Sequence, residues 1–192
     1  MPARSTVRKA FLFVVGLAAL GAAGGLAFVY SGIYDISAIA QHTRPVYWIF
    51  DVALRRSVAI RAPEAVPVDL DDPELLETGF DHYQVHCVQC HGAPGVAPQP
   101  FALGMTPLPA NLAHSARNWS PEEIFWIVEN GVKMSGMPAW KFRMSPEEMW
   151  AVTAFVMHLP TIAPVRYRAM VEQGGLAGPQ PAPQLSSRWG AP

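Results

Sequence analysis

The segment that most constrains this chain is Cys87-Val88-Gln89-Cys90-His91, which has the form C-x-x-C-H. Its two cysteines are the only cysteines in the 192-residue chain. Two thiols at this spacing on a helical turn match the two vinyl groups of a haem, and the histidine that follows is then placed under the iron. The motif therefore predicts one covalently attached haem c, with thioether links to Cys87 and Cys90 and with His91 as an axial ligand of the iron.

Two other uses of the cysteine pair are open at this point. The thiols can form a structural disulfide, or they can be half of a zinc site. Structural zinc usually takes four ligands, often from two separated pairs. The sequence has no second cysteine pair, although His82 and His86 lie nearby. A thioredoxin-like redox pair needs a βαβ pattern around it, and the sequence shows none, so haem attachment is the favoured prediction.

Composition and charge narrow the remaining classes of fold and partner. The formal net charge is −1, and the segment 72–160 carries nine acidic against four basic side chains. No basic stripe suits a nucleic acid, so we predict no nucleic-acid partner. Nineteen prolines favour long irregular connections over a continuous sheet. Together with the helical patterns described below, this composition predicts an all-α chain.

Residues 1–31 have the pattern of a transmembrane signal anchor. A short cytoplasmic stub containing Arg4, Arg8 and Lys9 precedes an uncharged run at 10–30, which is about the 20 residues a helix needs to cross a bilayer. A cleaved signal peptide is the alternative, but its apolar region is normally shorter. The positive-inside rule then predicts a single pass through the inner (plasma) membrane, with all later residues on the periplasmic side. Bacteria attach haem covalently on that side.

Residues 32–71 are predicted to form an amphipathic helix and a linker. The helix is expected at about 46–62, after Pro45 at its first position. Asp51 and Arg55 form an i,i+4 ion pair on one face. Another face carries an apolar stripe: Tyr47, Phe50, Leu54 and Val58. The helix can pack on the haem domain, face a partner subunit, or lie on the membrane surface, where its arginines would touch anionic headgroups. A proline-broken segment then leads to residue 71.

Residues 72–160 are predicted to form a haem domain of about three helices. The first starts at Asp72-Pro73 and brings Gly79 and Tyr83 onto the face that leads to the haem motif. The other two begin with capping boxes, at 120–123 and at 145–148. Pro160 is expected to stop the last helix, whose Trp150 and Phe155 would pack against Gly79 and Tyr83.

The segment 93–118 has almost no periodicity and contains five prolines. A loop of this length is unusual in a compact domain, unless a haem supplies the apolar surface on which it packs. Val96, Phe101, Leu103, Leu108 and Leu112 are candidates for that wall. We also expect a backbone carbonyl in this loop, near Pro98, to accept a hydrogen bond from Nδ1 of His91 and so to orient the ring.

Met137 is the predicted second axial ligand of the iron. It lies in a loop between the last two helices, with Gly136 and Pro138 on either side. A thioether sulfur is a soft, neutral ligand that favours reduced haem iron and raises its potential. Met134, one helical turn earlier, is the alternative. We expect His114 and His158 to be satisfied by ordinary hydrogen bonds.

These residues resemble the class I cytochrome c domain. The resemblance rests on Gly79, Tyr83 and the haem motif with Gly92, on the loop 136–139 with the sequence G-M-P-A, and on the closing helix around Trp150 and Phe155. It implies an α-helical domain around one covalent haem, with His91 and Met137 as axial ligands, and it implies an electron carrier. The anchor and the helix at 46–62 lie outside the matched region. They are similar to those of membrane-anchored monohaem cytochromes of bacterial respiratory chains.

The function expected from these features is one-electron transfer on the periplasmic side. With both axial positions filled, the iron has no open site, so we do not expect an enzyme. The expected partners are an electron donor, either a dehydrogenase or a quinol-oxidising complex, and an acceptor such as a terminal oxidase. A fixed cytochrome subunit of a membrane oxidoreductase complex is the alternative, followed by a haem enzyme or gas sensor. Residues 161–192 are expected to form a flexible tail rich in Pro and Gly, with Trp189 as a docking residue or a stray aromatic.

Overall fold

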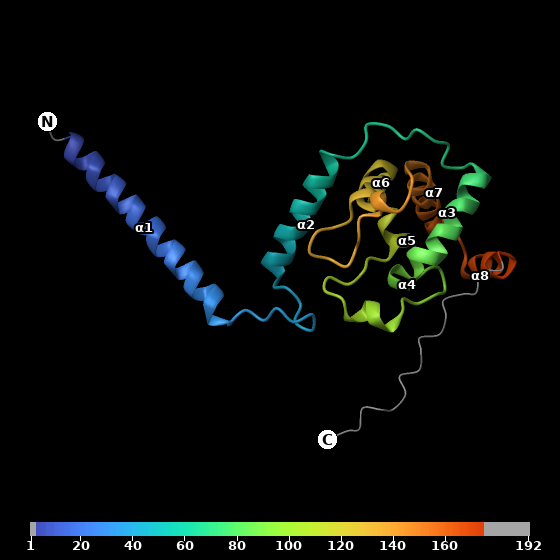
Figure 1. Cartoon of the computed structure of the whole chain (residues 1–192), viewed down its shortest axis with the longest axis horizontal. Helices are drawn as coiled ribbons and strands as arrows, with labels where there is room; N and C mark the ends of the chain where they lie inside the picture. Colours follow the sequence, from blue (N-terminus) through green and yellow to red (C-terminus); the bar gives the residue numbers. More distant parts are fainter. Residues whose placement is uncertain (1–2, 175–192) are drawn as a thin grey trace, which may run out of the picture. The chain divides into compact units, whose positions relative to one another are not determined.

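The computed structural model describes residues 3–174 and, over that range, contains helices and irregular segments but no strand (Figure 1). The chain divides into two compact units, one ending at Ala40 and one starting at Gln41. The predicted all-α class is therefore confirmed. The α-helices are α1 (Ala3–Ser31), α2 (Arg44–Ala59), α3 (Pro73–His86), α4 (Val88–His91), α5 (Leu112–Ser115), α6 (Pro121–Asn130), α7 (Pro146–His158) and α8 (Pro164–Gln173). Three short 3-10 helices are η1 (Pro100–Gly104), η2 (Trp140–Phe142) and η3 (Leu159–Thr161).

The first unit consists mainly of α1. The most apolar 18-residue stretch of its segment Ser5–Ser31 has a mean hydropathy of 2.3, and none of that stretch is buried. By length and composition this helix can cross a membrane. A signal sequence at the start of a chain has the same properties.

The second unit begins with α2, which packs on α6. Val58 of α2 is fully buried and Leu54 is partly buried, whereas Tyr47 and Phe50 of the predicted stripe stay exposed. The guanidinium of Arg55 lies 4.8 Å from the ring centroid of Trp119. Arg55 also makes the predicted pair with Asp51, with Nε 3.2 Å from Oδ2. Val58 and the Arg55–Trp119 contact fix one face of α2 to the rest of the second unit.

The domain core is formed by α3, α6 and α7. Helices α3 and α7 approach so closely at Gly79 that a Cβ atom there would lie 2.0 Å from the carbonyl oxygen of Ala151. Beside this contact, the Phe155 ring packs on Tyr83 with a centroid separation of 5.2 Å. Trp150, which we expected at the same contact, stacks on Phe125 of α6 at 4.1 Å. The glycine thus allows the crossing that holds the three helices together.

Local sequence signals place the helix starts as predicted. The Asp72 carboxylate accepts a hydrogen bond from the backbone N–H of Glu74 at the start of α3. Ser120 and Ser145 both begin complete capping boxes. In each box the serine hydroxyl accepts a hydrogen bond from the backbone N–H of the glutamate three residues later, and the carboxylate of that glutamate accepts one from the serine N–H. These bonds satisfy backbone donors that have no partner inside the helix.

The prediction of a flexible tail from residue 161 is wrong for the residues that the structure describes up to Gln173. Residues Pro164–Gln173 form α8, because Tyr167 is buried against Phe80 with ring centroids 5.9 Å apart. The Tyr167 hydroxyl also donates to Oε1 of Gln84 at 2.9 Å. The rest of that expectation, including Trp189, lies outside the described residues.

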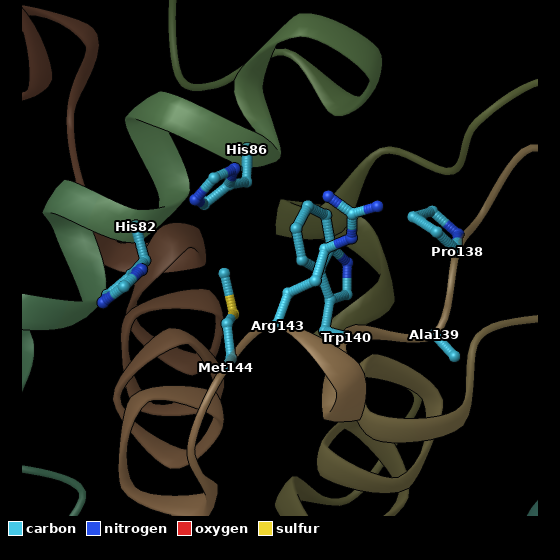
Figure 2. A pocket seen from close by; sticks show the side chains of 7 residues that line it. All are labelled: His82, His86, Pro138, Ala139, Trp140, Arg143 and Met144. Carbon is cyan, nitrogen blue, oxygen red and sulfur yellow. The ribbon is translucent and has the colours of Figure 1, made fainter.

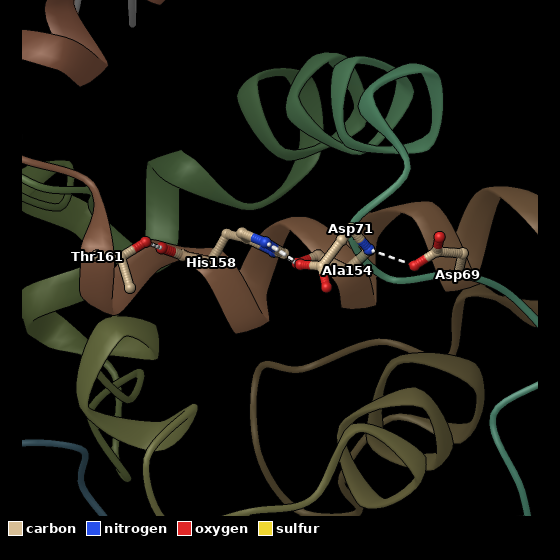
Figure 3. Close-up of polar contacts among 5 residues, drawn as sticks. All are labelled: Asp69, Asp71, Ala154, His158 and Thr161. Atoms are coloured by element: carbon tan, nitrogen blue, oxygen red, sulfur yellow. Dashed lines mark hydrogen bonds and ion pairs between the residues drawn. The ribbon is translucent and has the colours of Figure 1, made fainter.

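The segment before α3 is tied to the end of α7 by His158 (Figure 3). Its Nδ1 lies 2.9 Å from the carbonyl oxygen of Ala154, and its Nε2 lies 3.0 Å from Oδ1 of Asp71. The backbone N–H of Asp71 in turn donates to Oδ1 of Asp69. His158 is therefore satisfied by hydrogen bonds, as predicted, and it has a structural role.

Candidate haem site

The two cysteines lie at the junction of α3 and α4. Helix α3 ends at His86, Cys87 caps it, and α4 turns immediately, so that the backbone N–H groups of Cys90 and His91 both donate to the carbonyl of Cys87. Both cysteines are free thiols. No group of three or more His, Cys, Asp or Glu side chains suited to a metal ion occurs within residues 3–174. The described residues thus give no support to the disulfide or zinc alternatives.

Burial keeps both thiols protonated at neutral pH. It raises the pKa of Cys87 to about 12, with a further contribution from nearby Cys90. Burial also raises the pKa of the less enclosed Cys90. The turn therefore presents two neutral, unpaired thiols one helical turn apart, which is the donor set that two thioether links require.

The His91 ring is oriented by the loop that follows it. Its Nδ1 lies 2.7 Å from the carbonyl oxygen of Ala110, and since a carbonyl only accepts, Nδ1 carries the proton. Nε2 is then left with its lone pair, as a metal ligand requires. Burial lowers the pKa of His91, and the Ala110 bond raises it. The ring is thus held in its neutral form.

The expected carbonyl near Pro98 was wrong in position. After His91 the chain reverses through a backbone pair between Ala93 and Val96, and Pro98 packs over Gly92. The partner of Nδ1 comes instead from Ala110, directly before the α5 N-cap Asn111.

The Tyr83 hydroxyl makes a second tie to this turn, which sequence reasoning missed. It donates a 2.6 Å hydrogen bond to the carbonyl oxygen of Gly92, and both groups are buried. Burial raises the pKa of this hydroxyl, with nearby Cys87 as a smaller cause. The bond fixes the chain just after His91 onto α3. Its sequence signal was Tyr83 itself, one turn before the motif on the buried face of the helix.

The Met137 loop folds back over the end of α6. The backbone N–H of Val132 donates to the carbonyl of Met137 at 3.1 Å, and the N–H of Met137 donates to the Ser135 hydroxyl. Gly131 lies in the left-handed region, with φ +66, and a Cβ atom there would be 2.7 Å from the Met137 oxygen. Met137 is partly buried, whereas the Met134 side chain is 79 % exposed.

The segment 93–118 joins the His91 turn and the Met137 loop. At Ala110 it binds His91, and at Met105 it packs on Gly136, where a Cβ atom would lie 3.0 Å from the Met105 sulfur. Three of its large apolar side chains, Phe101, Leu103 and Leu108, are exposed rather than buried in the protein's own core. An oriented imidazole, two free thiols and an uncovered apolar wall fit a haem.

A cavity of about 690 Å³ lies beside the Met137 loop (Figure 2). Its lining contains His86 and His82 of α3, Trp140, Arg143 and Met144, with Pro138 and Ala139 from the loop. The His86 ring packs on Trp140 with centroids 4.8 Å apart. Burial lowers the pKa of His86, and the neighbouring His82 lowers it further. The cavity therefore combines aromatic surface with one permanent cation, next to the predicted ligand loop.

Comparison with known proteins identifies the central part of the chain. Residues 74–156 match the family model described as cytochrome c oxidase, cbb3-type, subunit III. This segment is a class I c-type cytochrome domain. The cytochrome domain covers α4, α5 and α6 and most of α3 and α7, and so includes the haem motif and the Met137 loop. A search of curated proteins gave no match.

A cytochrome c domain of this kind binds haem and transfers electrons. Helices α1, α2 and α8 lie outside the matched segment.

Proposed function

We propose that this chain is a membrane-anchored monohaem cytochrome c that carries single electrons on the periplasmic side, in a bacterial respiratory chain. Cys87 and Cys90 hold the haem covalently, and His91 and Met137 bind its iron. The observation that carries the proposal is the oriented His91 imidazole on the C-x-x-C-H turn of a cytochrome c domain. The apolar run of α1, which follows basic residues at the start of the helix, supports the anchor and its orientation.

The chain's own residues hold the site in one geometry. A haem supplies a one-electron iron couple when bound. The carbonyl of Ala110 accepts a hydrogen bond from Nδ1 of His91 and so orients the ring. The same bond makes Nε2 of His91 a more basic ligand for a metal. Gly131 and Ser135 position the Met137 backbone. The choice of Met137 over Met134 is supported by exposure, because the Met134 side chain faces solvent.

Electrons are expected to enter or leave beside the Met137 loop. There the cavity is lined by half-buried Trp140 and exposed Arg143, next to Pro138 and Ala139. A partly exposed aromatic surface with one cation suits brief contact with a redox protein. The proposed donor is a dehydrogenase or quinol-oxidising complex, and the proposed acceptor is a terminal oxidase or another periplasmic electron acceptor.

A fixed cytochrome subunit of a membrane oxidoreductase complex is the second candidate. The name of the matching family, an oxidase subunit, favours it. The two candidates differ in assembly rather than in chemistry. Mild detergent extraction of native membranes, followed by a native gel stained for haem, separates them: a free carrier migrates near the mass of one chain with detergent, and a fixed subunit migrates with a large complex.

Substitution of the haem-binding residues tests the site itself. A Cys87→Ala, Cys90→Ala double variant should lose haem staining on a denaturing gel, because no thioether link remains. Met137→Ala should abolish the methionine-to-iron charge-transfer band of the oxidised protein and lower the potential. Met134→Ala is the matched control and should leave both unchanged. Unchanged haem staining in the double variant, or loss of the band only in the Met134 variant, would contradict the proposed ligands.

A further inference from the structure

The outward face of α2 is apolar although it packs on nothing in the second unit. The inward face is held to α6 through Val58 and Leu54. The opposite face carries large apolar side chains at helical spacing: Trp48 is 65 % exposed, Ile49 55 % and Val52 38 %, and Ile60, just after the helix, is 75 % exposed. We call these four residues the outward face of α2.

A helix with apolar residues on both sides needs cover on both sides. The outward face gathers one indole and three branched aliphatic side chains between residues 48 and 60, whereas isolated apolar side chains on a surface are common. A second surface in contact with this face is therefore required, and its chemistry can be argued from the charges around it.

Positive charge surrounds the outward face. Between residues 44 and 61 the chain has four arginines and a single acid, Asp51. Asp51 forms an ion pair with Arg55, so it does not neutralise the charges of the other three arginines. Arg44 lies one turn before Trp48 and Arg56 lies one turn after Val52, and both arginines are exposed. Arginine beside tryptophan and aliphatic side chains is the composition of helices that lie in the headgroup region of an anionic bilayer.

The chain also limits how far α2 can be from a membrane. The connector between the end of α1 at Ser31 and the start of α2 at Arg44 is residues 32–43. Fully extended, it spans at most about 40 Å. With α1 in a bilayer, a lipid surface is therefore always within reach of α2, at high effective concentration. A separate protein partner has no such advantage.

We propose that the outward face of α2 seats on the anionic lipid surface of the membrane that α1 anchors. This inference rests on the proposed membrane anchor. Trp48, Ile49, Val52 and Ile60 enter the headgroup region, and Arg44 and Arg56 bind lipid phosphates. Because Val58 and the Arg55–Trp119 contact fix α2 to the cytochrome domain, this docking sets the orientation of the domain on the membrane.

Photocrosslinking in the full-length haem-loaded protein tests the proposal. Ile49 is replaced by p-benzoylphenylalanine, and the protein is reconstituted in vesicles of phosphatidylcholine and phosphatidylglycerol. The control position is Val165, which is 75 % exposed. It belongs to α8, a helix drawn on the other side of the second unit from α2 (Figure 1). We expect several-fold more lipid adduct from position 49 than from position 165. Equal yields at the two positions would overturn the proposal.

Two further measurements identify what covers the face. An Arg44→Gln, Arg56→Gln variant should give less lipid adduct at position 49, whereas Arg168→Gln on α8 should not. An unchanged yield in the double variant would refute binding to anionic headgroups. In native membranes, a protein adduct at position 49 without a lipid adduct would show a subunit interface and overturn the proposal.

Carbonate extraction of the same vesicles keeps this test separate from the proposed anchor. A chain released by carbonate contradicts the anchor through α1. A chain that stays in the membrane but gives no excess of lipid adduct at position 49 contradicts only the docking of α2.

Discussion

Gly131 determines where the Met137 loop lies. Its φ is +66, and a Cβ atom would be 2.6 Å from the carbonyl carbon of Pro138. Gly131→Ala should therefore cost about 1–2 kcal/mol in backbone strain and displace the loop from the end of α6. We expect the methionine-to-iron band to weaken and the potential to fall, as measured by absorbance spectroscopy and redox titration. Gly104→Ala, where a Cβ atom meets nothing within 4 Å, is the control; equal effects of both substitutions would contradict this role.

Glu148 makes the start of α7 sensitive to acid. The backbone N–H of Ser145 donates to its carboxylate at 2.7 Å, and this bond, aided by nearby His82, holds the pKa of Glu148 below its ordinary value of 4.5. A lowered folded-state pKa means that the stabilisation is present above pH 4.5 and is lost as the pH falls through the folded-state pKa.

Glu148→Gln should therefore lower the melting temperature at pH 6, and the difference from the unmodified protein should shrink towards pH 3. Thermal melts followed by circular dichroism measure both. Glu147→Gln removes the same charge from the same turn and should show a smaller effect at pH 6. A difference between Glu148→Gln and the unmodified protein that stays constant from pH 6 to pH 3 would rule out the carboxylate as its source.

At this scale, the residues that could be predicted are those whose partners are close in sequence. The capping bonds of Asp72, Ser120 and Ser145 link residues two or three apart, so their signals are local. The partner of His91 is 19 residues away, and its identity depends on the path of a loop without periodicity. For that reason a carbonyl was correctly expected, but Ala110 was not identified.

At the scale of elements, the contact between α3 and α7 depends on the absence of a side chain at Gly79. A methyl group there would overlap the carbonyl of Ala151 and the Cβ atom of Phe155. Gly79→Ala should lower the free energy of unfolding by about 1–3 kcal/mol, as measured by denaturant titration. The same substitution at Gly104, in η1, should change it little. Similar losses at the two positions would show that helix packing is not the cause.

The elements themselves were predicted wherever apolar periodicity and a cap agreed, as in α3, α6 and α7. Helix α8 was missed because its sequence is polar overall and its N-cap residue has no capping side chain. Its position depends on Tyr167, which is buried against Phe80 of α3. Such a contact between distant segments leaves no periodic signal in the sequence.

At the scale of the whole molecule, the boundary after Ala40 predicts a separable domain. The second compact unit contains α2 and the bond from Gln41 to the Thr106 hydroxyl. A chain starting at Gln41 and exported with a cleavable signal should bind haem and melt like the full-length protein. It should also be extracted by carbonate, whereas the full-length chain should stay in the membrane. Failure of the shorter chain to retain haem would contradict this boundary.

The charge beside the Met137 loop should affect reactions with small ionic oxidants. Arg143 lines the cavity there, together with Trp140. Arg143→Glu should slow the oxidation of the reduced protein by ferricyanide by about threefold at low salt, because the carboxylate repels the ferricyanide anion. Stopped-flow kinetics measure the rate, and Arg168→Glu on α8 is the control. If both variants slow equally, only net charge matters and electrons do not leave preferentially at the cavity.

The burial of Cys87 also bears on the order of haem attachment and folding. Its side chain is 8 % exposed, and the thiol is enclosed by the helices of the folded domain. An enzyme that attaches a haem cannot reach a sulfur in that position. If a haem is attached to Cys87 as proposed, attachment must therefore precede closure of α3 against α7. Covalent haem attachment then competes with folding, and a substitution that speeds folding can reduce the yield of haem-loaded protein.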